Sequence, residues 1–369
     1  MQRRAIKNMS RKLASIQKII DVSPITGADR IELVHVLGWQ CVAKKDEFNA
    51  GDKCIYFEID SFLPIRPEFE FLRASGYKNS TLLGEGFLLR TQKFRGEISQ
   101  GLALPLNAVL SAEQQDALRT ADGTIPCGTD VTELLGVRKW EIPERATGSG
   151  TVIGEAAGQI PITDETRIQS EPALLEEFAG VPFYITTKLD GTSCSIAMGA
   201  DRVMRVFGHN YEFADDGKSP FFEYVKKRGL ADKLKVLMDQ SGIERISVQG
   251  EFCGEGIQKN RLRLKTPEWF VFTVNEDGKR CALAELRHVA DALGVRTVPI
   301  EETGDDLVST YPTEAALLER CTLNPCHIYP GAPEGIVIRP IEPRYSPTLG
   351  RSLSMKVKNP AYELKHEGV

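Results

Sequence analysis

The sequence predicts an α+β protein of two domains, and three features of its 369 residues support this. The first 140 residues contain many short β-like runs with little helix, which is typical of a small β-barrel. A stretch rich in Pro, Gly, Ala, Ser and Thr at 141–161 predicts a linker. From 162 to the end, strands alternate with helical segments, as in a domain built on antiparallel sheets.

The individual elements are expected from apolar periodicity and turn signals. In the first domain the β-like runs are 13–22, 31–43, 53–59, 87–94 and 101–106, and a weak helical segment spans 111–119. In the second domain the helical stretches are 221–240, 283–293 and 313–321. No apolar run approaches the roughly 20 residues that a membrane helix needs, and the first residues lack a signal-peptide core. We therefore expect a cytoplasmic or nuclear protein that has no membrane partner. A monomer is also expected.

Basic residues are gathered in patches, although the net charge of −5 argues against a global attraction to nucleic acid. The four patches are Arg3, Arg4, Lys7, Arg11 and Lys12; Arg90, Lys93 and Arg95; Lys226, Lys227 and Arg228; and Lys259, Arg261, Arg263 and Lys265. Any of them can be an ordinary solvated face. The fourth is favoured as a phosphate-backbone contact, because Arg261 and Arg263 alternate on a strand-like segment. The eight cysteines include no C-x-x-C pair, so neither a zinc ribbon nor a disulfide framework is indicated.

The segment Lys188-Leu189-Asp190-Gly191 places a lysine between a β-run and a tight turn. A lysine becomes a nucleophile when nearby cations or partial desolvation lower its pKa, and a strand end can hold it against one phosphorus atom. The alternative for an isolated copy of this tetrapeptide is a charged hairpin turn. Lys188 is therefore a candidate nucleophile.

Three more short signatures follow Lys188 along the chain. They are Gln249-Gly250-Glu251-Phe252, Glu334-Gly335-Ile336-Val337-Ile338 and Lys356-Val357-Lys358. The i, i+2 spacing of Lys356 and Lys358 points both ammonium groups to one face of a strand, where they can converge on a phosphate. Glu334 stands at the mouth of a buried strand and is a suitable ligand for Mg²⁺ or Mn²⁺, and Glu251 has a similar placement. Either glutamate can instead be a plain strand terminus.

The segment 269–274 alternates aromatic and smaller residues and predicts a half-buried strand. Phe270 and Phe272 share one face of it. Phe272 is the ring that stands next to the polar residues that follow, and both rings can be ordinary core.

The ordered set of four motifs resembles the covalent nucleotidyltransferase superfamily of polynucleotide ligases and mRNA capping enzymes, in which such motifs line a nucleotide cleft. Few residues follow Lys358, so we expect no barrel module after it. An N-terminal barrel followed by a terminal catalytic domain resembles the ATP-dependent RNA ligases of the Naegleria and Deinococcus type. The resemblance implies an OB-fold-like nucleic-acid-binding domain at 1–140, a linker at 141–161, and an antiparallel-sheet nucleotidyltransferase domain at 162–369, of the ATP-grasp-like ligase adenylation kind.

The resemblance also implies a three-step reaction. Lys188 attacks ATP to form lysyl-AMP, AMP passes to an RNA 5′-phosphate, and a 3′-OH displaces it to seal the strand, expected at nicks in duplexes. The implied catalytic residues are Lys188, Asp190, Lys356 and Lys358, with Asp190 positioning Lys188 or contacting the 3′-OH strand. The implied ATP-binding residues are Lys188, Gly191, Glu251, Phe272, Glu334, Lys356 and Lys358, with Arg167 and Gln169 from a lead-in at 163–169 that resembles one in RNA ligases. Glu334 and Glu251 are the implied ligands of Mg²⁺ or Mn²⁺.

Contacts with RNA are expected from His209, Asn210, Arg261 and Arg263. At 208–210 this chain has Gly-His-Asn where the family often has Ser-Arg-Asn, so His209 replaces an arginine that engages the nucleic-acid end. Three alternatives stay open at this point. They are a capping guanylyltransferase that uses GTP, a DNA ligase, and a non-catalytic RNA-binding protein that keeps the nucleotidyltransferase fold.

Overall fold

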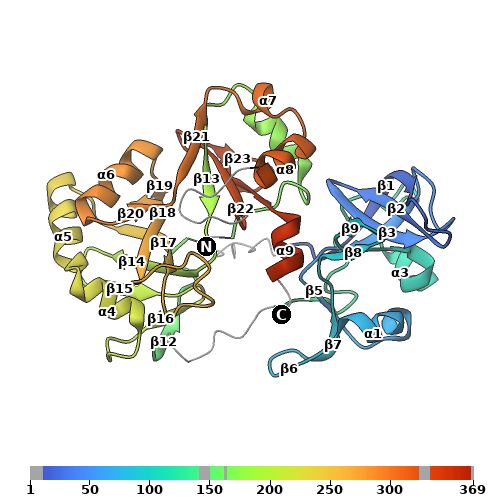
Figure 1. The fold of residues 1–369 in the computed structure, drawn as a ribbon, viewed down its shortest axis with the longest axis horizontal. Helices are drawn as coiled ribbons and strands as arrows, with labels where there is room; N and C mark the ends of the chain where they lie inside the picture. Colours follow the sequence, from blue (N-terminus) through green and yellow to red (C-terminus); the bar gives the residue numbers. More distant parts are fainter. Residues whose placement is uncertain (1–10, 141–149, 162–163, 324–332, 367–369) are drawn as a thin grey trace. The chain divides into compact units, whose positions relative to one another are not determined.

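The computed structural model describes residues 11–140, 150–161, 164–323 and 333–366 (Figure 1). The chain divides into two compact units, the first made of Met1–Pro143 with Glu363–Val369 and the second of Glu144–Tyr362. Residues 141–149 of the expected linker lie outside the described residues. The rest of that linker was predicted wrongly in part, because Val152–Glu155 form strand β12 and pair with a strand of the second unit. Among the described residues, no helix is long and apolar enough to cross a membrane.

The first unit is built on a five-stranded antiparallel sheet and a four-stranded one. The five-stranded sheet has the order β10 (Leu102–Pro105), β4 (Lys53–Phe57), β1 (Ala14–Pro24), β2 (Ile31–Val36) and β3 (Trp39–Lys44). The four-stranded sheet has the order β11 (Arg138–Lys139), β5 (Ser61–Leu63), β7 (Gly84–Leu88) and β6 (Tyr77–Ser80). Strand β1 pairs with β4 along its first half and with β2 along its second, with a bulge between Ile19 and Asp21. Such a bend lets one long strand serve both sides of a barrel.

Short helices and one hairpin complete this unit. The helices are η1 (Pro67–Leu72), α1 (Arg73–Gly76), α2 (Leu106–Val109) and α3 (Ala112–Ala117). Helix α3 begins with a capping box between Ser111 and Gln114, and it corresponds to the weak helical segment expected from the sequence. The hairpin of β8 (Gln92–Phe94) and β9 (Glu97–Ser99) turns at Arg95 and Gly96, both with positive φ.

The second unit is built on two larger sheets and a separate strand pair. The larger one, called the large sheet, has the order β12, β16 (Tyr211–Phe213), β15 (Met204–Phe207), β14 (Thr192–Met198), β17 (Ile246–Cys253), β18 (Glu268–Glu276) and β19 (Lys279–Arg280), and β20 (Arg296–Thr297) pairs with β18. The other, called the second sheet, has the order β21 (Ile300–Gly304), β13 (Phe183–Lys188), β22 (Gly335–Pro340) and β25 (Met355–Lys358). A separate pair is formed by β23 (Tyr345–Ser346) and β24 (Arg351–Ser352).

Each sheet buries one face under helices. The helices α4 (Pro220–Lys227), α5 (Leu230–Ser241) and α6 (Leu283–Leu293) lie together beside the large sheet (Figure 1). They share an apolar core with Ile196, Val248 and Val271 of its strands. The second sheet packs against η2 (Pro172–Phe178), α7 (Leu307–Thr310) and α8 (Glu314–Leu323) through Ile185, Ile336 and Val357. Because side chains alternate along a strand, Lys188 and Lys356 of the second sheet lie on the face opposite its helix-covered core.

One expected helix is divided in two. The stretch 221–240 becomes α4 and α5, because Gly229 between them has a left-handed φ of 62° that a continuing α-helix cannot adopt. The last helix, α9 (Pro360–His366), directly follows β25 and begins beside the paired lysines.

Candidate active site

The candidate nucleophile and the paired lysines lie on neighbouring strands of the second sheet. Lys188 is the last residue of β13 and is opposite Gly335 of β22, which in turn is opposite Lys358 of β25. The next row of the same face contains Thr186, Val337 and Lys356. The register therefore places the three lysines on the same face of the second sheet, at the same end of its strands. For Lys356 and Lys358, the i, i+2 spacing predicts this common face.

Glu334, which precedes β22, joins two of these lysines. Lys188 Nζ donates a hydrogen bond to Glu334 Oε1 at 2.7 Å, and Lys358 Nζ lies 3.4 Å from the same oxygen. Glu334 is only 8% exposed. Burial alone would raise the pKa of Glu334, but the ammonium groups of Lys188 and Lys358 outweigh it and the pKa is lowered. The carboxylate is thus ionised and holds both amines in place.

Glu251 approaches the Lys188 turn from the large sheet. Its Oε1 accepts a hydrogen bond from the backbone N–H of Gly191 at 3.0 Å. Burial raises the pKa of Glu251 to about 8; the Lys188 charge opposes this rise and the Glu334 charge adds to it. A side chain at Gly191 would bring a Cβ to 2.5 Å from Cys253 Sγ, so the approach of β17 to this turn requires glycine.

Lys356 has a different environment from Lys358. Burial lowers the pKa of Lys356 to about 7, and the cations Arg167, Lys188 and Lys358 lower it further, while Asp164 opposes them. The lead-in segment forms a parallel bridge beside β25, with Arg167 opposite Lys356. This cationic row is arranged to receive an anion, because a phosphate group would restore the charge that burial disfavours.

Gln169 and Arg167 are both buried, at 1% and 4% exposure. In the described part of the chain, neither amide atom of Gln169 has a hydrogen-bond partner. Burying an amide without hydrogen-bond partners costs free energy. A binding site in which a ligand completes the hydrogen bonds is one reason for such an amide. Thr163, the first residue of the expected lead-in 163–169, lies outside the described residues.

The two candidate aromatic rings of β18 share a face but differ in burial. Phe270 is fully buried beneath the guanidinium of Arg296, whose carbon lies 5.0 Å from the ring centre. Phe272 is half-buried and packs at the border of the same apolar cluster. Phe272 is therefore the ring that keeps an accessible surface.

An ion-pair network that the sequence did not reveal supports Phe272. Arg339 Nη1 donates to the Phe272 carbonyl oxygen at 3.2 Å, and its guanidinium carbon lies 5.9 Å from the Phe272 ring centre. Arg339 Nη2 donates to Glu165 Oε1 at 2.7 Å, and Arg280 lies 3.8 Å from the same oxygen. Burial alone would raise the pKa of Glu165, but Arg339 and Arg280 outweigh it and hold it at about 2.

Asp190 has two partners that come from distant parts of the chain. Tyr362, on α9, donates its hydroxyl to Asp190 Oδ2 at 2.5 Å. The guanidinium of Arg261 forms an ion pair with the same oxygen and lies over the Tyr362 ring, 5.5 Å from its centre. Arg261 thus lies against the Lys188 turn. Tyr362 was not a candidate from the sequence, because its position depends on how α9 folds back.

The expected strand around Arg261 and Arg263 is wrong. The segment 254–267 is a loop in which Asn260 and Arg263 have left-handed φ values of 40° and 54°. The alternation of Arg261 and Arg263 along the sequence does not reflect a strand. β17 ends before Gly254, which has a φ of 143°, and the chain then turns instead of remaining extended. Arg263 is exposed at the loop surface, whereas Arg261 is turned inward to Asp190.

His209 and Asn210 occupy the turn between β15 and β16. His209 is half-buried and Asn210 is exposed, and the Asn210 carbonyl oxygen accepts a hydrogen bond from Ala156 at 2.9 Å. In the large sheet, β14 and β15 separate this turn from β17, which carries Glu251. Phe207 is opposite Ser195 of β14, and Ser193 is opposite Glu251 of β17, so the register continues this turn toward the row that contains Glu251.

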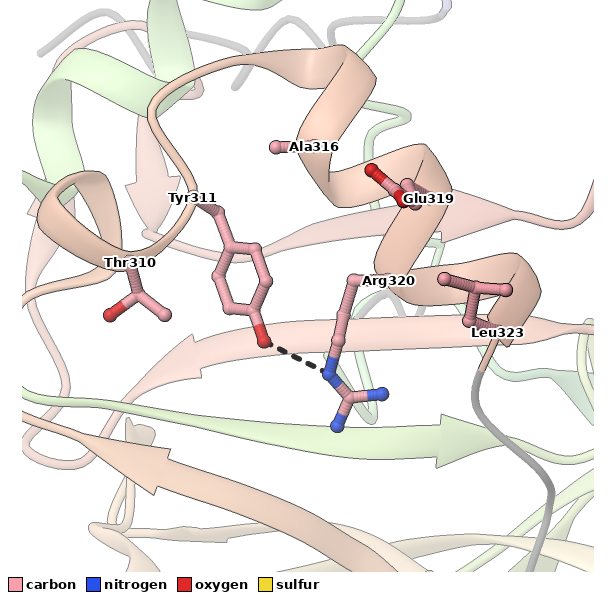
Figure 2. A pocket seen from close by; sticks show the side chains of 6 residues that line it. All are labelled: Thr310, Tyr311, Ala316, Glu319, Arg320 and Leu323. Atoms are coloured by element: carbon pink, nitrogen blue, oxygen red, sulfur yellow. Dashed lines mark hydrogen bonds between the residues drawn. The ribbon is translucent and has the colours of Figure 1, made fainter.

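A surface pocket in the second unit lies away from these residues. It has a volume of about 350 Å³ and is lined by Thr310, Tyr311, Ala316, Glu319, Arg320 and Leu323 (Figure 2). Figure 2 shows the hydroxyl of Tyr311 hydrogen bonded to Arg320, and Glu302 accepts from both of these side chains. The guanidinium of Arg320, which lines the pocket, is thus paired with Glu302.

Comparisons with known proteins match both parts of the chain. A family model described as an OB-fold domain matches residues 13–106, and one described as RNA ligase matches residues 181–358. No curated protein matches the chain. Among solved structures, Naegleria gruberi RNA ligase with PPi is 30% identical, with a TM-score of 0.82 over 97% of this chain and 99% of that one. A lysine-to-methionine mutant of the same ligase with AMP and Mn is 30% identical, with a TM-score of 0.83 and the same coverage, and a lysine-to-alanine mutant with ATP and Mn is 29% identical, with a TM-score of 0.83 over 96% of this chain and 99% of that one.

Proposed function

Since the chain belongs to the RNA ligase family, and is an ATP-dependent RNA ligase, we propose that it joins RNA 3′-OH and 5′-phosphate ends through a lysyl-AMP formed on Lys188. One observation carries this proposal. Lys188, which is half-buried, meets the buried side chains of Lys358 and Glu334 at the ends of neighbouring strands, with Lys356 in the next row of the same face. An amine fixed beside a row of cations is what attack on an α-phosphate requires.

In the first step the Lys188 ammonium gives one proton to water and its nitrogen bonds to the α-phosphorus. The bond from that phosphorus to pyrophosphate breaks, pyrophosphate leaves with the electron pair, and the nitrogen loses a second proton to water. Glu334 fixes the amine through the 2.7 Å hydrogen bond, which limits its directions of attack. Lys356 and Lys358 hold the α-phosphate and stabilise the charge that develops as pyrophosphate leaves. This division of labour fits the lowered pKa of Lys356, because a bound phosphate favours its charged form.

The adenosine site is assigned to Phe272, Gln169 and Arg167. The accessible ring of Phe272 can stack on the purine, and the Arg339 guanidinium supports that ring. The partnerless amide of Gln169 offers a donor and an acceptor to a base edge. Arg167 adds positive charge beside Lys356, on the side where the triphosphate would lie.

The carboxylates of Glu334 and Glu251 fit a hard divalent cation. The negative charge of Glu334 lies close enough to Glu251 to raise the pKa of Glu251. A cation shared by the two carboxylates would relieve this repulsion. Over residues 11–140, 150–161, 164–323 and 333–366, no group of three or more protein ligands is arranged around a metal. We propose that Mg²⁺ or Mn²⁺ is held by these carboxylates together with substrate phosphates. When bound, the cation would offset triphosphate charge as pyrophosphate is expelled.

In the later steps AMP passes to the RNA 5′-phosphate, and the 3′-OH then displaces AMP to close a nick in a duplex. We assign RNA contacts to His209, Asn210, Arg261 and Arg263, the residues expected from the family pattern. In the first unit, the tip of the β8–β9 hairpin presents Lys93, Phe94 and Arg95 to solvent. An exposed ring between two cations suits the stacking and phosphate contacts by which OB folds bind nucleic acid.

Covalent labelling tests the proposal directly. Wild-type protein, Lys188→Ala and the matched control Lys235→Ala, which changes an exposed lysine on α5, are incubated with α-labelled ATP or GTP and Mg²⁺ or Mn²⁺. We expect label from ATP on the denatured wild-type and control proteins and none on Lys188→Ala. Label from GTP would indicate a capping-type reaction, and no label would contradict the lysyl-AMP step.

The substrate is tested separately from the chemistry. Sealing is compared on nicked RNA duplexes, single-stranded RNA, and nicks whose 3′-OH strand is DNA. We expect the nicked duplex with an RNA 3′-OH strand to be sealed fastest. Equal rates with a DNA 3′-OH strand would show that the site does not read the 2′-hydroxyl.

A further inference from the structure

The residues after the paired lysines form a local unit that folds back on the Lys188 turn. The sequence continues Lys358-Asn359-Pro360-Ala361-Tyr362. The N–H of Asn359 donates to the carbonyl oxygen of Glu334 at 2.9 Å, and its buried side chain accepts from the N–H groups of Ala361 at 3.0 Å and Tyr362 at 3.4 Å. Asn359 and Pro360 are favourable residues for a helix start, so α9 begins immediately after β25. This places Tyr362 at a fixed distance from the cluster.

Tyr362 and Arg261 both act on one oxygen of Asp190. The Tyr362 hydroxyl lies 2.5 Å from Asp190 Oδ2, and the Arg261 guanidinium pairs with that oxygen. Tyr362 is 5% exposed, so water competes little for its hydroxyl. Burial and the Asp190 charge raise the pKa of Tyr362, which keeps it protonated and able to donate. Two donors on one oxygen leave the carboxylate little freedom to rotate.

The Lys188 side chain and the Asp190 side chain are therefore fixed by different groups. Lys188 is oriented by Glu334, whereas Asp190 is oriented by α9 and by the loop that contains Arg261. The same loop also fixes the backbone of the turn, because the Gln258 amide donates to the Gly191 carbonyl oxygen. Removing the Tyr362 hydroxyl changes the second set of contacts and leaves the first set in place.

We propose that Tyr362 is a positioning residue for strand sealing, which holds the Asp190 carboxylate, together with Arg261, where it orients the attacking 3′-OH. This inference rests on the proposed ligase function. In the sealing step the 3′-oxygen bonds to the 5′-phosphorus, the bond from that phosphorus to AMP breaks, AMP leaves with the electron pair, and the hydroxyl proton goes to water. Asp190 accepts a hydrogen bond from the hydroxyl, and Tyr362 acts only through Asp190.

The test separates the first and last chemical steps. Tyr362→Phe keeps the ring under Arg261 and removes only the donor, and Tyr345→Phe, at a ring that is 70% exposed, is the matched control. Lysyl-AMP formation from ATP and sealing of a pre-adenylylated nicked RNA without ATP are measured for each. We expect Tyr362→Phe to form lysyl-AMP within about twofold of the wild type and to seal about tenfold more slowly, as the loss of one charge-assisted hydrogen bond implies.

A double-mutant cycle with Asp190→Asn distinguishes positioning from a general structural effect. If Tyr362 acts through Asp190, adding Tyr362→Phe to Asp190→Asn should slow sealing by less than about twofold more. Multiplied losses, or wild-type sealing by Tyr362→Phe, would overturn the inference. Arg261→Met, which removes the other donor to Asp190, should also slow sealing more than lysyl-AMP formation. If Tyr362→Phe and Arg261→Met slow sealing and lysyl-AMP formation equally, the inference is overturned as well. Wild-type protein that forms no lysyl-AMP would instead overturn the proposed function.

Discussion

Phe272 and Phe270, neighbours on one face of β18, are expected to have separable functions. Phe270 is fully buried in an apolar cluster, so truncation to alanine leaves a cavity and should lower the free energy of unfolding by about 3–5 kcal/mol. Phe272 is half-buried and its outer surface is available to a purine. Loss of one base–aromatic stack is worth about 1–3 kcal/mol, so Phe272→Ala should weaken ATP binding by about five- to 150-fold.

The measurement needs ATP binding without turnover. Both substitutions are therefore made in a Lys188→Met background, which cannot form lysyl-AMP, and the dissociation constant of ATP is measured by calorimetry. Unfolding by urea is measured for the same proteins, because it reports the cavity at Phe270 independently of the ligand. Phe272→Trp is the matched control, since it keeps a stacking surface and should bind ATP within a few-fold of the parent protein.

Two results would refute the reasoning. ATP binding by Phe272→Ala within twofold of the parent would mean that this ring does not stack on the base. A folded Phe270→Ala protein that loses as much ATP affinity as Phe272→Ala would mean that the burial difference does not separate core from site. In the second case the accessible side of β18 would have to be assigned again.

Two further predictions follow from charges. At pH 8 Lys356 is mostly neutral because its pKa is about 7, so binding of metal-free ATP should raise that pKa and take up a proton. Calorimetry in buffers of different ionisation enthalpy should detect the uptake. The uptake should fall in Lys356→Arg to the share that Glu251, whose pKa is about 8, contributes, and an unchanged uptake in Lys356→Arg would show that Lys356 is not the acceptor. The double substitution Lys93→Glu and Arg95→Glu on the β8–β9 hairpin should weaken RNA binding and reduce its salt dependence while lysyl-AMP formation is unchanged; unaltered binding would contradict a role for this hairpin.

The family and the α+β fold class expected from the sequence are confirmed by the family models and by the solved ligase structures. The reason is that the informative features are local. A lysine before a tight Gly turn, a Glu-Gly before an apolar run, and lysines at i and i+2 each determine the face and the end of one strand. Strand pairing then brings Lys188, Gly335 and Lys358 into one row.

The contacts that the sequence did not predict are those that depend on loops and on distant segments. Arg261 was expected on a strand, but its loop turns it toward Asp190, and no local pattern reports such a turn. Tyr362 is separated from Asp190 by most of the second unit, and only the start of α9 brings it back. Arg339 and Glu165, which form an ion pair, are equally far apart in the sequence. An arginine within an apolar run that predicts a buried strand is nevertheless a signal, because its charge requires an acid nearby.

The apolar residues of β25 determine the active site as much as the lysines do. Met355 and Val357 are fully buried in the core of the second sheet, and Lys356 and Lys358 point to the opposite face. A slip of one residue would turn both lysines into that core and both apolar side chains toward the nucleotide, which burial forbids. The register is reinforced at Gly335, where an added Cβ would collide with the Val357 carbonyl oxygen, so this position of β22 has room only for a glycine. Hydrophobic packing on one face of the second sheet thus places the cations on the other.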